Sequence, residues 1–149
     1  ISVLKNNKLS FTRTIEIGNF DILEEIARNK NLSLKEASDY KQRNNLFEEE
    51  EDILILNNLM DDIYRSFDYF QVIYEQSEIH TAVLTGGGAE LEGIMPHLEA
   101  EFGLDVEKLS LTDRVTVRLE SLNRKEISDL SSLLGVSLGL ALRRGGENK

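Results

Sequence analysis

The sequence contains no cysteine and a single proline. Without cysteine the chain forms neither a disulfide framework nor a thiolate metal site, and this absence is typical of proteins in a reducing compartment. With 40% hydrophobic residues and one proline, the chain is expected to fold as one domain. No stretch reaches the roughly 18 apolar residues that a membrane-spanning helix needs, and no signal-type segment opens the chain. We therefore expect a folded cytoplasmic unit.

Basic residues are also scarce. The chain has 17 Lys and Arg against 27 Asp and Glu, which gives a formal net charge of −10. This charge repels nucleic acid and acidic lipid at long range and favours solubility. The sequence therefore predicts no nucleic-acid partner and no direct membrane insertion.

Catalytic and metal-binding patterns are missing as well. His80 falls in an expected strand and His97 in an expected helix, without a nucleophile that the sequence places beside either. No H-x-x-x-H or H-E-x-x-H spacing suggests a metal site. Carboxylates are abundant but unspecific in so acidic a chain. Residue chemistry alone therefore assigns no catalytic and no metal-binding residue.

The most informative stretch is the apolar run Ile79–Leu84, which breaks into three glycines, 86–88, and then resumes with helical spacing. This pattern predicts a strand, a tight turn and a helix. Glycines at the carboxyl end of a strand let a ligand approach the backbone. The turn lacks the Lys-Ser/Thr of a P-loop, and Leu91 stands where G-x-G-x-x-G needs its third glycine. Glu90 and Glu92 would repel a phosphate, so a neutral group such as a nucleoside fits better, with a plain connecting turn as the alternative.

Two strands and two helices are predicted before this turn. Apolar and polar residues alternate over residues 1–17 around Lys5-Asn6-Asn7-Lys8, whose asparagines tolerate the left-handed backbone of a tight turn. Helical spacing then continues to about Asn29. Ser33 and Glu36 form a capping-box pattern that starts a second helix. The sequence therefore predicts a β-hairpin followed by a helix pair.

A long helix is predicted over about residues 50–76. Its apolar residues recur in steps of three and four, at Ile53, Leu56, Met60, Ile63, Phe67, Phe70 and Tyr74. The acids Glu48–Asp52 are expected to form its solvated first turn. The apolar stripe is wide and aromatic, which favours packing across a sheet over a coiled-coil dimer.

Alternating elements are predicted after the glycine turn. We expect a short turn and then a helix, which has Pro96 near its start, runs through Phe102 and ends at a Gly103 cap. The remaining predicted elements are an edge strand over about 104–111, a strand at Val115 and Val117, and a buried helix over 128–144 with Gly135 and Gly139 placed for close backbone approach.

The order of these motifs resembles the second half of the actin-like ATPases, and within them the PilM family of type IV pilus assembly proteins. The segments that carry the resemblance are Ile17-Gly18-Asn19-Phe20-Asp21, Ala37-Ser38-Asp39-Tyr40-Lys41, Leu84-Thr85-Gly86-Gly87-Gly88-Ala89-Glu90-Leu91-Glu92-Gly93 and Leu138-Gly139-Leu140-Ala141-Leu142-Arg143. The resemblance covers nearly the whole chain. It implies an α/β fold of the actin-like (ribonuclease H-like) type, with a mixed sheet, flanking helices and a small inserted subdomain.

The resemblance also implies a division of residues 1–149. The subdomain core would comprise 1–20 and 77–149, a helical inserted subdomain about 21–50, and the long helix about 50–76 would return to the core. The chain begins at Ile1, without methionine and inside an expected strand, so we expect a fragment whose upstream part is missing. That part would hold the catalytic half and both phosphate loops.

The nucleotide site is implied by the resemblance alone. In the superfamily, the turn that matches Thr85, Gly86, Gly87, Gly88 and Ala89 contacts adenosine, which agrees with the expected repulsion of phosphate. The family's A-E-x-x-K helix contacts the nucleoside from the inserted subdomain. It matches at Ala37 and Lys41, with Ser38 where glutamate is usual. The implied cofactor is ATP, with Mg²⁺ in the full-length protein and weak or no binding by this fragment, which would lack ATPase activity.

The PilM resemblance further implies a partner and a location. The cytoplasmic tail of the inner-membrane protein PilN would dock on the missing half, placing the protein in the cytoplasm beside the bacterial inner membrane. One alternative is an FtsA-like cell-division protein, although that family ends in a membrane helix and this chain ends at residues 143–149. The other is a non-catalytic interaction module that self-associates through the long helix.

Overall fold

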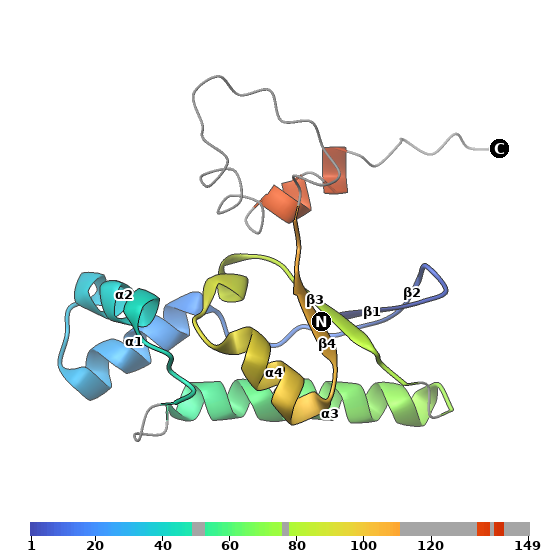
Figure 1. Cartoon of the computed structure of the whole chain (residues 1–149), viewed down its shortest axis with the longest axis horizontal. Helices are drawn as coiled ribbons and strands as arrows, with labels where there is room; N and C mark the ends of the chain where they lie inside the picture. Colours follow the sequence, from blue (N-terminus) through green and yellow to red (C-terminus); the bar gives the residue numbers. More distant parts are fainter. Residues whose placement is uncertain (49–52, 76–77, 111–133, 138, 142–149) are drawn as a thin grey trace.

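The computed structural model describes residues 1–48, 53–75, 78–110, 134–137 and 139–141. The elements, in chain order, are β1 Ser2–Lys5, β2 Lys8–Thr12, α1 Asn19–Lys30, α2 Leu34–Arg43, α3 Leu54–Ile73, β3 Thr81–Leu84, the 3₁₀ helix η1 Gly87–Glu90, α4 Ile94–Phe102 and β4 Asp105–Lys108 (Figure 1). Residues 134–137 and 139–141 are also helical. The strand predicted at Val115 and Val117 lies outside the described residues.

The predicted hairpin is confirmed over β1 and β2. Asn6 and Asn7 adopt φ values of 53° and 59°, the left-handed conformation that a two-residue hairpin turn requires. The second strand is shorter than predicted, because it ends at Thr12. The last ladder bond runs from the Arg13 amide to the Ile1 carbonyl at 2.9 Å, so the residues after it have no partner in β1.

The helix pair α1 and α2 is confirmed, and so is the start signal of α2. The Glu36 amide donates to Ser33 Oγ at 3.3 Å, and the Ser33 amide donates to the Glu36 carboxylate at 2.9 Å. These two bonds satisfy backbone donors that the first turn leaves unpaired. The Ser33 hydroxyl also donates to Glu36 Oε2 at 2.7 Å, and this bond, together with the one from the Ser33 amide, lowers the pKa of Glu36. The pair lies to one side of the strands (Figure 1).

The long helix α3 begins later than predicted. Its N-cap is Ile53 and its first turn contains no acid, so the prediction that Glu48–Asp52 form that turn is wrong. A carboxylate from another helix takes their place. Glu25 of α1 is 8% exposed, and its Oε2 accepts the Ile55 amide at 2.9 Å. The unpaired N–H groups and the positive dipole at the start of a helix stabilise a buried carboxylate. Here this interaction also links α1 to α3.

Helix α3 borders the core, and α4 and the strands lie on one side of this helix (Figure 1). Phe70 is 2% exposed, and its ring centroid lies 6.2 Å from that of Phe11 and 4.8 Å from that of Tyr74. The ring centroids of Phe67 and of Phe102 in α4 lie 5.2 Å apart. The aromatic stripe therefore packs within the chain, as the preference for a core helix predicted. No described helix is long and apolar enough to cross a membrane.

The α/β class is confirmed, with small sheets and flanking helices. The described strands form an antiparallel pair, β1–β2, and a parallel pair, β3–β4, joined through α4. These pairs are not hydrogen-bonded to each other, so the described strands do not make the single mixed sheet that was expected. A cavity of about 1110 Å³ lies between them, lined by β1, by residues 78–85 and by apolar side chains of α3 and α4.

Candidate functional site

The glycine turn begins where β3 ends, at the carboxyl end of a parallel strand. Gly86 has φ 86° and ψ −179°, a conformation that is open essentially to glycine alone. The Ala89 amide then donates to the Gly86 carbonyl at 3.1 Å, which closes the first turn of η1. A Cβ built on Gly86 or Gly88 would meet no atom within 4 Å. The backbone of this turn therefore has open space beside it, as the approach of a ligand requires.

The predicted turn residues differ in what they offer. Thr85 and Gly88 are exposed, whereas the side chain of Ala89 is buried in the core. Ala89 can therefore present only its backbone to a ligand, while its methyl group anchors η1. Gly103, the predicted cap of α4, has φ 64° and confirms the end of the helix that follows.

The second predicted group comes from α2. Lys41 is 7% exposed, and its Nζ donates to Asn19 Oδ1 at the start of α1, at 2.5 Å. Burial lowers the pKa of Lys41, and the negative charge of Glu90 opposes that shift. The charge of Glu90 at the end of η1 is the interaction that links Lys41 of α2 to the region of the glycine turn. Ser38 lies one turn earlier on the same helix and is half-buried.

Glu90 has a larger part in the structure than the sequence suggested. Its carboxylate forms an ion pair with Lys108 Nζ of β4, and the two side chains are 37% and 33% exposed. The sequence assigned Glu90 only the repulsion of phosphate. It gave no role to Asn19 or Lys108, because their roles depend on how α1 and β4 pack against other elements.

Gly93, at the start of α4, is the point at which the loop after α2 packs closely against the chain that follows the glycine turn. It has φ 81°, and a Cβ built on it would lie 2.0 Å from Asn45 Oδ1. The same oxygen accepts the Phe47 amide at 3.1 Å, so Asn45 is held in place. The resemblance had included Gly93 in its motif without a role. The structure shows that only a residue without a side chain allows this contact.

The helical segment 134–137 touches the first residue of the turn. A Cβ on Gly135 would lie 2.6 Å from Thr85 Oγ1, which confirms the predicted close approach at this glycine. No atom of the described residues lies within 4 Å of the Cβ position of Gly139, so they show no close approach there. The expectation of a buried helix is wrong for its described part. The apolar residues of this segment are exposed at Leu134, Val136 and Leu140, since the segment approaches Thr85 through Gly135 instead.

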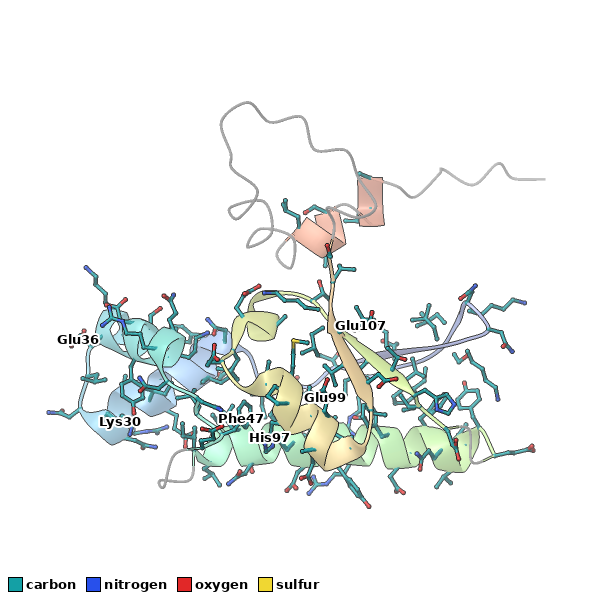
Figure 2. All side chains as sticks on the ribbon, in the orientation of Figure 1. Lys30, Glu36, Phe47, His97, Glu99 and Glu107 are labelled. Atoms are coloured by element: carbon teal, nitrogen blue, oxygen red, sulfur yellow. The ribbon has the colours of Figure 1, made fainter. Side chains whose placement is uncertain are left out.

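The two histidines lie in different surroundings. His80 is exposed, and the ring of His97 stacks on Phe47 with centroids 4.3 Å apart (Figure 2). Across the described ranges, no group of three or more His, Asp or Glu side chains could hold a metal ion.

The cavity between the strand pairs is a separate feature. Of the predicted site residues, only Thr85 lines it, and Lys41 and Ser38 do not. Strand edges and apolar side chains make its walls. The candidate site instead comprises the turn and α2, with Lys41 bonded to Asn19 of α1 and Glu90 paired with Lys108 of β4.

Comparison with known proteins identifies a matching family and similar solved structures. The family model described as type IV pilus assembly protein PilM matches residues 1–145. A solved structure titled "PilM-PilN type IV pilus biogenesis complex" contains a chain that is similar to this one, with a TM-score of 0.79 and 25% sequence identity. The alignment covers 95% of this chain and 41% of that chain, so this chain spans about two fifths of its length. No curated protein matches.

Proposed function

Because the chain belongs to the PilM family of type IV pilus assembly proteins, we propose that it forms the nucleotide-binding half of a pilus assembly scaffold. The observation that carries this proposal is the open glycine turn, next to which Glu90 acts electrostatically on Lys41 of α2. In this arrangement, residues 1–20 and 77–149 form the core, and about 21–50 form the helical inserted subdomain. Helix α3 returns the chain to the core.

The adenosine part of a nucleotide fits this position best. Gly86 and Gly88 leave open space beside the backbone, and Thr85 is exposed next to them. Glu90 and Glu92 disfavour phosphate at this end of the site. The ammonium of Lys41 donates to Asn19 Oδ1, and since an ammonium has three N–H donors, it would use another for a nucleoside oxygen.

ATP is the nucleotide we propose. Thr85–Ala89, Ser38 and Lys41 would hold its adenosine, and when bound it would supply a phosphate chain whose Mg²⁺ and phosphate ligands come from the longer protein. Binding by residues 1–149 alone would then be weak, with a Kd on the order of 1 mM, and would come without hydrolysis.

PilN is the proposed partner. The similar solved structure is a PilM–PilN complex, which supports this choice. The contact would involve the cytoplasmic tail of PilN and the half of the protein outside these residues. It would hold the protein in the cytoplasm, at the bacterial inner membrane.

A titration of the ¹⁵N-labelled chain with ATP, followed by amide chemical shifts, tests the nucleotide site. We expect millimolar affinity, with the largest shifts at Gly86, Gly88 and Ala89. Lys41→Met keeps the apolar stem and should weaken binding several-fold, whereas Lys35→Met, at an exposed position of the same helix, should not. Absence of shifts in the turn would contradict the nucleoside site. Tight, magnesium-dependent binding would contradict the division of the site between two halves.

A further inference from the structure

The helical segment 134–137 lies at the ends of both strands of the β3–β4 pair (Figure 1). A Cβ built on Gly135 would lie 2.6 Å from Thr85 Oγ1 and 2.9 Å from Leu109 Cδ2. Thr85 is the first residue after β3, and Leu109 is the first residue after β4. Because these strands are parallel, both end at the edge from which the glycine turn opens. The segment therefore approaches the start of the turn with its backbone.

The two neighbours of Gly135 differ in how easily they could make room for a side chain. Leu109 Cδ2 is the end of a flexible side chain, which can move to another rotamer. Thr85 is branched at Cβ and therefore stiff about χ1, and its Oγ1 is attached directly to that branch point. A side chain at position 135 would thus have to change the rotamer of Thr85 or move its backbone. Gly86 follows at once with φ 86°, so a movement of the Thr85 backbone would continue into the turn.

The large apolar side chains of this helical region do not account for its approach to the turn. Leu134 is 46% exposed, Val136 71% and Leu140 64%. What allows the approach is the missing side chain at Gly135, since glycine lets another part of the chain come close to its backbone.

We propose that Gly135 is a positioning residue of the nucleoside site: it lets the helical segment set the rotamer of Thr85 and the path by which the chain enters the glycine turn. The inference rests on the proposed function of the turn. A ligand that binds through the backbone of Gly86 and Gly88 gains affinity when that backbone is held in its bound conformation beforehand. Gly135 therefore acts on the ligand through Thr85 and does not contact it.

Gly135→Ala tests this role, and Gly139→Ala is the matched control. Both glycines lie in helical segments, so both substitutions should favour the helix to a similar extent. Only the first places a methyl group against Thr85, since no atom of the described residues lies within 4 Å of the Cβ position of Gly139. In the ligand-free chain, Gly135→Ala should change the three-bond couplings that report χ1 of Thr85 and should shift the amides of Gly86 and Gly88. Gly139→Ala should change neither.

Titration with AMP, followed by the amide shifts of the turn, then measures the effect on binding. Gly135→Ala should weaken binding several-fold, and Gly139→Ala should leave it unchanged. Thr85→Ala removes the atom that the new methyl group would meet. Gly135→Ala should therefore weaken binding no further in the Thr85→Ala background. A general loosening of the fold would weaken binding in both backgrounds, so this cancellation identifies positioning through Thr85.

The outcomes separate the contact, the positioning role and the proposed function. Turn amides and Thr85 couplings that do not respond to Gly135→Ala would overturn the contact and the role together. An AMP affinity that Gly135→Ala leaves unchanged, or lowers equally in both backgrounds, would overturn the positioning role while the nucleotide site itself stands. A wild-type turn that does not respond to AMP would overturn the proposed function and the positioning role with it, whereas the ligand-free spectra would still decide the contact.

Discussion

Replacing Gly93 with alanine is expected to destabilise the fold strongly. The new Cβ would lie 2.0 Å from Asn45 Oδ1, 2.4 Å from Asn45 Cγ and 2.6 Å from Asn45 Nδ2, so the whole amide group would have to move. The backbone at φ 81° adds a further cost for any residue with a side chain. The left-handed conformation costs about 1–2 kcal/mol and overpacking about 1–3 kcal/mol, which together predict a loss of about 2–5 kcal/mol.

Urea unfolding followed by far-UV circular dichroism measures this loss. Gly88→Ala is the matched control, because its Cβ position is open and its φ is not in the left-handed region. We expect the control to change the free energy of unfolding by less than about 0.5 kcal/mol.

A double-mutant cycle with Asn45→Ala isolates the steric part. Removing the amide gives the new methyl group space, so Gly93→Ala should cost about 1–3 kcal/mol less in the Asn45→Ala background than in the wild type. Additive effects of the two substitutions, or a Gly93→Ala loss no larger than that of Gly88→Ala, would refute the contact between the loop after α2 and α4.

Three further predictions concern the core and the buried charges. Burial lowers the pKa of Lys41, so at this residue the folded chain binds fewer protons than the unfolded chain. The stability of the wild type relative to Lys41→Met should therefore rise with pH between the lowered pKa and the ordinary value of 10.5, as measured by urea midpoints. A stability difference that does not change with pH would contradict the burial of Lys41. Glu25→Ala should cost about 1–3 kcal/mol by leaving the Ile55 amide without its acceptor, and Glu25→Gln less, whereas equal losses would argue against this cap. Phe70→Ala should lower the free energy of unfolding by about 3–5 kcal/mol, and Tyr69→Ala should lower it much less. A Phe70→Asp variant that stays folded, and whose dimer dissociates in sedimentation, would instead support the interaction module.

Local signals were read correctly from the sequence. The Asn6-Asn7 turn, the Ser33 and Glu36 capping box and the Gly103 cap each depend on residues within a few positions of one another. Backbone geometry at that range is set by the local residues themselves. The Thr85–Ala89 turn was found in the same way, because a strand followed by glycines has few other structures.

Contacts between distant segments could not be predicted from the sequence. The cap of α3 by Glu25, the ion pair of Glu90 with Lys108 and the contact of Asn45 with Gly93 all depend on how separate elements pack. An acidic chain offers many carboxylates, so charge alone pointed to Glu48–Asp52 for the first turn of α3 and missed the buried Glu25. The early end of β2 likewise depends on the length of its partner strand.

The central claim is that a nucleoside binds at Thr85–Ala89 and α2, and intermolecular nuclear Overhauser effects with AMP test it most directly. We predict contacts from the adenine and ribose protons to the α protons of Gly86 and Gly88 and to the side chain of Lys41. Contacts confined to the methyl groups of Val3, Ala82 and Leu98, which line the cavity between the strand pairs, would contradict it.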